Sequence, residues 1–207
     1  MLILLRMILK KILTACKYHL KDKWEFIYLG IDITVPTFSL PNMEDSLSVR
    51  IADKNDIPKI ESDIGIHLAD YDRKQIQRIG EKGFSCFVGL KNDKIIHFFL
   101  VYESAINSLL AKTPFDKKKM HKADAYLGSA FTVPDARGLW VVPIVLMKIL
   151  EHLKDRKTIS RALVLVHKET PGAAEFYQRL GFSIIQNSEQ QNLLYFFAKG
   201  LNYFQKN

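Results

Sequence analysis

Apolar and polar residues follow two different periods along this chain, and the changes of period predict its elements. Short apolar runs indicate strands at residues 47–52, 84–90, 95–101, 124–133, 161–166, 182–186 and 193–198. A period of 3.6 residues indicates helices from Ile57, over residues 71–82, after Arg137 and before Gly181. The order is strand, two helices, three strands, helix, strand, helix and two strands, which predicts a mixed α/β fold.

Capping and turn residues define several of these boundaries. Asp53 supplies a cap for the helix that starts at Ile57. Residues 91–94, Lys-Asn-Asp-Lys, join two apolar runs and predict a β-hairpin. Gly128 and Ser129 interrupt the strand 124–133 and favour a β-bulge there.

The chain divides into an N-terminal extension, residues 1–46, and a main domain, residues 47–207. Pro36, Pro41 and the polar residues 42–46 indicate a linker between the two. Before this linker, residues 24–33 are rich in aromatic and β-branched side chains and favour an additional strand.

The composition is that of a globular protein, with 48% hydrophobic and 25% charged residues among 207. The net charge of +8 is concentrated near the N-terminus, because residues 1–23 hold six basic side chains against one acidic one. We therefore expect no nucleic-acid partner, and we interpret Lys117, Lys118 and Lys119 as a solvated loop. Cys16 and Cys86 form neither a metal-binding cluster nor a disulfide framework, so we expect no metal and a cytoplasmic setting.

Residues 1–23 predict a basic amphipathic helix. Arg6, Lys10 and Lys11 interrupt any apolar run long enough to span a bilayer. The two lysines also exclude a lipoprotein signal ending at Cys16. The helix either packs on its own domain or on a second subunit, as in a homodimer, or binds an anionic membrane surface, which would be the inner surface for a cytoplasmic protein.

Two segments carry candidate chemistry. In residues 131–144 a strand breaks at Pro134, passes through Arg137 and Gly138, and runs into a helix. The unpaired N–H groups and the dipole of a helix start favour a phosphate, although such a joint also occurs without a ligand. In residues 170–182, Thr170 is expected to cap a helix that Gly181 ends.

Together these segments resemble the GNAT superfamily of N-acetyltransferases over residues 47–198. The family pattern Arg/Gln-x-x-Gly-x-Gly/Ala aligns with residues 137–142, where Trp140 and Val142 replace the required small residues. Its helix pattern Asn-x-x-Ala-x-x-x-Tyr-x-x-x-Gly-Phe is matched by four residues, with Thr170 in place of asparagine: Ala173, Tyr177, Gly181 and Phe182. Pro143 makes the first segment similar to GNAT proteins associated with polysaccharide pathways.

The resemblance implies a mixed, mostly antiparallel sheet flanked by helices, and acetyl-CoA as the cofactor. It implies that Tyr177 protonates the departing thiolate. It also implies a set of cofactor-binding residues: Phe131, Thr132, Val133, Arg137, Gly138, Leu139, Trp140, Val141, Val142, Thr170 and Ala173.

The expected function is acetyl transfer to an amine, and the acceptor stays open between a small metabolite, a sugar amine and a protein amine. The alternative is a GNAT-fold binding or scaffold module without cofactor, in which the ring of Trp140 fills the pyrophosphate position and Tyr177 is a packed aromatic. His97 and Cys86, both in apolar strands, are expected to be buried and structural. Four residues border strand ends as possible bases, and no spacing distinguishes one of them: Glu103, His121, Asp124 and Asp135.

Overall fold

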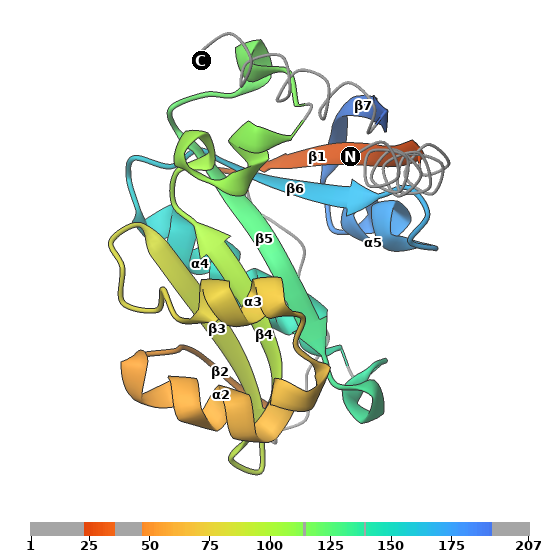
Figure 1. The fold of residues 1–207 in the computed structure, drawn as a ribbon. Coiled ribbons are helices and arrows are strands. Elements are labelled where there is room, and N and C mark those ends of the chain that lie inside the picture. The colour runs from red at the N-terminus through yellow and green to blue at the C-terminus, as the bar shows by residue number, and fades with distance from the viewer. Residues whose placement is uncertain (1–22, 36–46, 114, 139, 192–207) are drawn as a thin grey trace, which may run out of the picture.

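The computed structural model describes residues 23–35, 47–113, 115–138 and 140–191. The predicted basic helix 1–23, apart from Lys23, the linker residues 36–46 and the predicted strand 193–198 lie outside these ranges. Within them, seven strands form one sheet in the order β2-β3-β4-β5-β6-β1-β7 (Figure 1). The strands are β1 Lys23–Asp32, β2 Leu47–Ile51, β3 Phe84–Lys91, β4 Lys94–Tyr102, β5 Asp124–Thr132, β6 Arg161–His167 and β7 Ser183–Gln191.

Helices cover both faces of this sheet. The helices α2 Ile57–Ile64 and α3 Asp70–Ile76 pack on one face, and α4 Val141–Asp155 and α5 Ala173–Arg179 pack on the other (Figure 1). Short 3₁₀ turns lie in the connections: η1 Lys54–Asp56, η2 Gly65–His67, η3 Ala105–Asn107, η4 Leu109–Lys112, η5 Lys117–Lys119 and η6 Pro134–Ala136. Adjacent strands are antiparallel except β5 and β6, so the predicted mixed, mostly antiparallel fold is confirmed.

The strand at residues 24–33 is present as β1, and it lies inside the sheet. Residues 26–32 of β1 pair with β6 on one side, and its residues 23–30 pair with β7 on the other. Gly30 fits between these neighbours, because a Cβ there would lie 2.5 Å from Ile185 Cδ1 and 3.0 Å from Leu163 Cδ2. The N-terminal strand thus joins β7 to the rest of the sheet.

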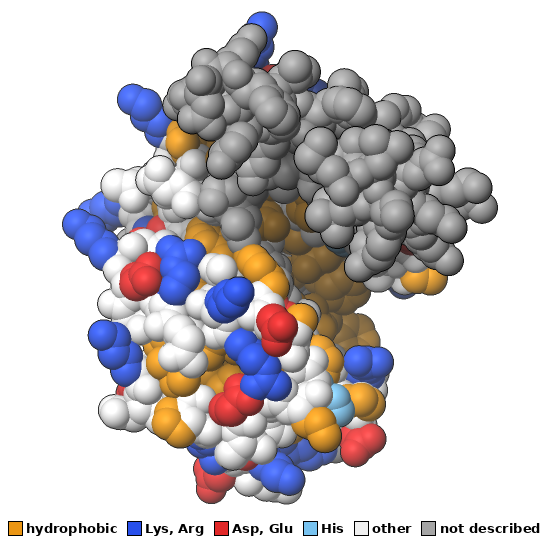
Figure 2. Space-filling model, viewed as in Figure 1, with side chains coloured by type: hydrophobic (Ala, Val, Ile, Leu, Met, Phe, Trp, Pro, Cys, Tyr) orange, Lys and Arg blue, Asp and Glu red, His pale blue; other side chains and the backbone are white. Residues whose placement is uncertain are grey.

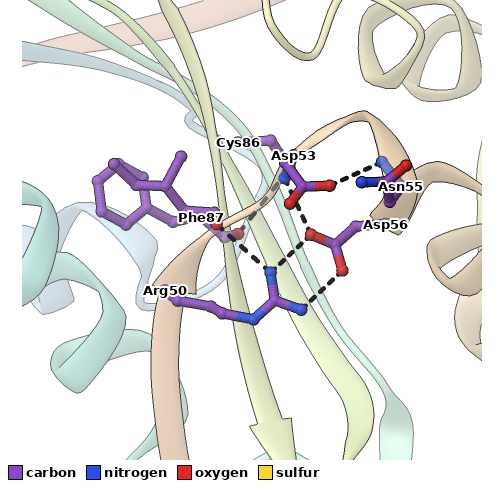
Figure 3. A network of polar contacts seen from close by, with 7 residues as sticks. Arg50, Asp53, Asn55, Asp56, Cys86 and Phe87 are labelled. Atoms are coloured by element: carbon purple, nitrogen blue, oxygen red, sulfur yellow. Dashed lines mark hydrogen bonds and ion pairs between the residues drawn. The ribbon is translucent and has the colours of Figure 1, made fainter.

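The predicted capping residues are present one turn before α2, where Asp53 caps the 3₁₀ turn η1 that leads into the helix, and α2 itself has no side-chain cap among the described residues. The Asp53 carboxylate accepts a hydrogen bond from the Asn55 amide at 2.7 Å, and Asp56 accepts one from the Asp53 amide at 2.9 Å. Figure 3 shows Arg50 of β2 reaching the same carboxylate with both terminal nitrogens, each at 2.6 Å from an Asp56 oxygen. This bidentate pair joins the edge strand to the start of the helix and holds the pKa of Asp56 below its usual value.

The predicted hairpin is confirmed between β3 and β4, where Asn92 and Asp93 both take positive φ, as a two-residue type I′ turn requires. Two helix boundaries were predicted wrongly. The helix α3 ends at Ile76 and not at residue 82, because the chain tightens into 3₁₀-type bonds and turns through Gly80 at φ 91°. The helix α5 begins at Ala173 after Gly172 at φ 71°, so Thr170 does not cap it.

Buried side chains on α4 follow the predicted stripe, with one change. Val145, Leu146, Ile149 and Leu153 are buried, as expected. Val142 is only partly buried, and Val141 takes the inward position in the first turn. Cys86 is buried in β3, as predicted, and burial raises the pKa of its thiol to about 12.

His97 is confirmed as a buried histidine beneath the start of α4. Its Nδ1 is hydrogen-bonded to Thr132 Oγ1 at 2.8 Å, whereas its Nε2 has no partner among the described residues. A Cβ on Gly89 would lie 3.3 Å from His97 Cβ and 3.5 Å from Val141 Cγ1, so the histidine and the first turn of α4 meet over Gly89. Burial lowers the pKa of His97 to about 3, and the ring is therefore neutral in the folded protein at pH 7.

Leu29→Ala tests whether β1 is integral to the sheet. Leu29 is completely buried, so we expect the free energy of unfolding to fall by about 2–5 kcal/mol. Val35→Ala, which truncates a side chain that is 55% exposed, is the control and should change it by less than about 0.5 kcal/mol. Chemical denaturation measures both, and equal small effects would mean that β1 adds little to the fold.

His97→Gln tests the buried neutral histidine. An unfolded histidine binds a proton below about pH 6.5, whereas folded His97 does so only near pH 3. The wild-type protein should therefore lose stability as the pH falls through this window, by up to about 2–3 kcal/mol from this group at pH 4.5. The loss should shrink in His97→Gln and persist in the control His121→Gln, whose ring is exposed, when unfolding is measured at pH 7 and pH 4.5.

Candidate functional site

The strands β5 and β6 run side by side over a short distance and then separate. They pair in parallel at four positions, from Asp124 opposite Arg161 to Leu127 opposite Val164. The predicted bulge then occurs, because residues 127–130 of β5 span the positions that Val101 to Phe99 occupy on β4. Beyond it, β5 continues along β4 and β6 continues along β1, so the two strands diverge (Figure 1). We call the space between them beyond Leu127 and Val164 the β5–β6 opening.

One strand edge beside this opening keeps its backbone groups unpaired by neighbouring strands. The Val133 amide donates to Ile96 O at 2.9 Å, so Val133 faces β4. Because adjacent residues of an antiparallel pair direct their backbone groups to opposite sides, the N–H and C=O of Thr132 face the opening. Of the three predicted edge residues, Thr132 is thus the one placed to pair with an extended ligand, and the ring of Phe131 packs with Phe98 at 6.4 Å on the α3 side of the sheet.

The connection from β5 to α4 takes the backbone conformation that glycine usually provides. Gly138 has φ 84°, and a Cβ at this position would meet nothing within 4 Å, so space is open beside it. Trp140, at the N-cap of α4, has φ 58° and ψ 11°, and its side chain is 54% exposed. The predicted residue Leu139 lies outside the described residues.

The start of α4 presents amides without a side-chain cap from the described residues. The amides of Val141 and Val142 have no intrahelical acceptor four residues earlier, and Pro143 has no N–H. The first hydrogen bond that encloses this turn runs from the Ile144 amide to Trp140 O at 3.2 Å. Unpaired amides at the positive end of a fifteen-residue helix are suited to bind an anion.

Arg137 lies against the end of β5. Its Nε donates to Thr132 O at 3.3 Å, and its guanidinium lies 6.0 Å from the centre of the Phe131 ring. The side chain is exposed, so its positive charge stays next to the last open backbone position of β5.

The helix α5 supplies the other predicted residues on the side of β6. Ala173 is its first residue and is partly buried, while Thr170 is exposed in the turn before it. Tyr177 stacks edge-on with Phe176 and Phe182, with ring centres at 5.3 and 5.2 Å. Burial raises the pKa of its phenol, so the hydroxyl keeps its proton at neutral pH. Tyr177 packs on the same face of the sheet as α4, against the same hydrophobic core cluster.

The four possible bases do not converge on the opening. Asp124 is completely buried and accepts hydrogen bonds from Arg161 at 2.7 and 2.9 Å. It is the first residue of β5, at the opposite end of the strand from the first turn of α4. Glu103 lies at that same end of the sheet, with one carboxylate oxygen 3.2 Å from Arg156 and 3.7 Å from His152. His121 and Asp135 are exposed. The first two are therefore structural ion pairs.

Sequence reasoning missed a carboxylate that does lie near the bulge, Asp72 of α3. One of its oxygens is buried without a partner among the described residues, and burial raises the pKa of the carboxyl, which the Ser129 hydroxyl lowers by less. The only sequence signal was Ser129 itself, a polar residue in an apolar strand. Figure 2 shows hydrophobic side chains at the back of a recess on this face of the molecule.

The described residues contain no group of three or more histidine, cysteine or acidic side chains arranged to hold a metal ion. None of their helices is both long enough and apolar enough to cross a membrane.

Comparison with known proteins shows the fold at low sequence identity. No protein-family model and no curated protein matches the sequence. Among solved structures, a GCN5-related N-acetyltransferase from Sphaerobacter thermophilus matches with a TM-score of 0.55 at 15% identity, over 86% of this chain and 54% of that one. A GNAT-family acetyltransferase from Novosphingobium aromaticivorans matches with a TM-score of 0.54 at 10% identity, over 82% and 63%.

A third structure has a bound cofactor. Arabidopsis thaliana NAA60, in complex with acetyl-CoA, matches with a TM-score of 0.53 at 14% identity, over 68% of this chain and 86% of that one. The match to the first two proteins spans less than two thirds of their lengths. The sheet, its separated parallel pair and these similarities show that the chain has the fold of the GNAT N-acetyltransferases.

Proposed function

We propose that the chain is an N-acyltransferase that moves an acetyl group from acetyl-CoA to an amine. The observation that carries the proposal is the uncapped first turn of α4 beside the β5–β6 opening. It combines an anion-binding helix start with an unpaired strand edge, and a ligand with a pyrophosphate and an amide-containing arm needs both. The similarity to acyltransferase folds supports the same conclusion.

The residues present fit coenzyme A. The amides around Gly138, Trp140, Val141 and Val142 would hold the pyrophosphate, and Arg137 would add positive charge beside them. The N–H of Thr132, which faces the opening, would pair with the pantetheine arm, which then passes the small side chain of Ala173. When bound, acetyl-CoA supplies an acyl group activated as a thioester.

Trp140 does not prevent the loop from forming. Glycine serves such loops through positive φ, and Trp140 takes φ 58° despite its side chain. A non-glycine residue in this region costs about 1–3 kcal/mol, and the surrounding structure must supply that free energy. Because the amides and not the side chains contact the phosphates, the substitution leaves the binding groups in place.

Tyr177 is the residue that we assign as the acid. Its raised pKa keeps the phenol protonated at neutral pH, and a departing thiolate needs a proton from such a group. Its place on α5 puts it on the same face of the sheet as α4.

Two features favour the alternative, a binding or scaffold module. Pro143 removes one amide of the first turn, and Arg137 occupies the carbonyl of Thr132, so the grip on a cofactor is reduced by two groups. Coenzyme A binding separates the two functions directly.

Val142→Glu tests the helix start as the phosphate site. At one hundred times its dissociation constant, coenzyme A should stabilise the wild-type protein by about 2.7 kcal/mol. A carboxylate in the first turn is favourable for the helix dipole but repels phosphate, so the variant should fold normally and bind coenzyme A at least about tenfold more weakly. Calorimetric titration and thermal melting measure the two effects.

Met147→Glu is the matched control, because it places the same charge on a partly buried position in the middle of α4. Its affinity for coenzyme A should stay close to that of the wild type. Absence of coenzyme A binding by the wild-type protein at millimolar concentration would remove the enzyme proposal and leave the scaffold alternative.

Tyr177→Phe tests the acid. The change removes only the hydroxyl, so turnover should fall by roughly 10²-fold or more while the Kd for coenzyme A stays nearly constant. Single-turnover kinetics, in which chemistry limits the rate, give the measurement. An unchanged rate would reassign Tyr177 to packing against Phe176 and Phe182.

A further inference from the structure

The last backbone groups of β5 have a fixed position beside the β5–β6 opening. Thr132 lies opposite His97 in the β4–β5 register, and its hydroxyl is hydrogen-bonded to Nδ1 of this buried histidine at 2.8 Å. The side chain therefore fastens Thr132 to β4, while its N–H and C=O face the opening. An extended ligand that pairs with one residue of a strand edge uses both of these groups, as a neighbouring strand does.

One of the two groups, the carbonyl, is already occupied by a side chain of the same chain. After β5 the backbone turns back through η6, where the Arg137 amide donates to Pro134 O at 3.1 Å. The buried Ala136 anchors this turn. The side chain of Arg137 thereby returns to the end of the strand, where its Nε donates to Thr132 O at 3.3 Å.

The guanidinium of Arg137 lies beside an aromatic ring that is held from two sides. Its central carbon is 6.0 Å from the centre of the Phe131 ring. That ring stacks on Phe98 of β4 and on His67 of η2, with ring centres at 6.4 and 5.5 Å. Contacts with three separate elements therefore define the place where the guanidinium lies.

The contacts that hold Arg137 there are weak. The hydrogen bond is long, the side chain is exposed, and an exposed cation near an aromatic ring gains little. Among the described residues no carboxylate pairs with Arg137, and its two terminal nitrogens have no hydrogen-bond partner. Contacts of this kind favour the closed arrangement by on the order of tenfold, so a stronger ligand displaces the side chain.

A second partner for the same guanidinium is an anion at the start of α4. Gly138 follows Arg137 at φ 84°, and a Cβ there would meet nothing within 4 Å, so the loop is open on its way to the helix. The first turn presents the amides of Val141 and Val142 without a side-chain cap from the described residues. A phosphate accepts hydrogen bonds from the planar guanidinium more strongly than a neutral carbonyl does.

We propose that the bond from Arg137 to Thr132 O is an autoinhibitory contact, which closes the edge of β5 in the free protein and opens when a phosphate binds at the first turn of α4. The inference rests on the proposed coenzyme A site and adds the order in which that site fills. Pyrophosphate binds first and attracts Arg137, which releases the carbonyl. The pantetheine arm then pairs with both backbone groups of Thr132.

This contact couples the two halves of one ligand. The affinity for the arm is reduced by the fraction of molecules in which the carbonyl is occupied, so pyrophosphate raises that affinity by freeing the carbonyl. By thermodynamic reciprocity, pantetheine raises the affinity for pyrophosphate by the same factor. A residue that only stabilised the fold would produce no such coupling.

The test titrates the full-length protein with pantetheine and with inorganic pyrophosphate as separate probes, followed by chemical shifts. Saturating pyrophosphate should tighten the binding of pantetheine to the wild type by about threefold or more. Arg137→Ala should bind pantetheine alone about threefold more tightly than the wild type does, because its carbonyl is free. The same variant should bind pyrophosphate about tenfold more weakly and show no coupling between the probes.

Arg179→Ala is the matched control. The Nε of Arg179 also donates to a backbone carbonyl at 3.3 Å, that of Glu175, and its side chain is also exposed. The variant therefore loses the same charge and the same kind of contact, but from α5. It should keep the coupling of the wild type.

The outcomes separate this contact from the proposed function. Independent binding of the two probes by the wild type, or failure of pantetheine to bind even with saturating pyrophosphate, would overturn the inference without any variant. An unchanged or weaker affinity of Arg137→Ala for pantetheine would overturn it as well. Coenzyme A is titrated in parallel: if it binds while the probes bind independently, the proposed function stands and only the autoinhibitory contact fails.

Discussion

The separation of β5 and β6 after four paired positions is the constraint on which the arrangement of the site depends. Backbone groups in a sheet are normally paired, so a strand that leaves its neighbour exposes donors and acceptors at a definite place. The bulge at Gly128 and Ser129 bends β5 away, and α4 and α5 pack on the same face, each with its own strand. The position of the helix start relative to Tyr177 follows from this divergence.

The polar groups near the two ends of β5 differ in whether they have hydrogen-bond partners. At the beginning of the strand, Asp124 is buried but fully compensated by two bonds from Arg161 and one from the His121 amide. Toward the other end, the described residues include a buried Asp72 oxygen without a partner among them, a helix start that none of their side chains caps, and a tryptophan in the left-handed region. Polar groups without partners and strained residues reduce the stability of the fold. Several of them around one opening are expected of a ligand-binding site and not of a sheet with only a structural role.

Local signals in the sequence were sufficient wherever the determining residues are neighbours in the chain. The Asn92-Asp93 turn, the Asp53 cap and the bulge are set by adjacent residues, and each was predicted. The end of α3 and the cap of α5 were wrong because glycines at positive φ compete with helix propensity and polar capping, and a single sequence does not show which dominates.

The rest of the site depends on contacts between distant segments. Asp72 is one acid in an amphipathic helix, and only its buried oxygen in the folded protein distinguishes it from the exposed Asp70. The place of β1 depends on partners at the opposite end of the chain, which alternation of apolar residues cannot identify. The cofactor-binding and catalytic roles of the loop and of Tyr177 stay predictions.

The position of β1 has a consequence for how the chain acquires its structure. Phe26 pairs with His167, and Trp24 pairs with Gln190, so the first described strand meets its partners only after most of the chain has been made. Contacts between such distant segments close large loops and slow folding. During synthesis, β1 must wait, unpaired, while the β3–β4 hairpin and the helices around it form. The pairing of β1 with β6 and β7 is thus the last step in completing the sheet. A chain released early from the ribosome would lack β7, and one edge of β1 would be exposed.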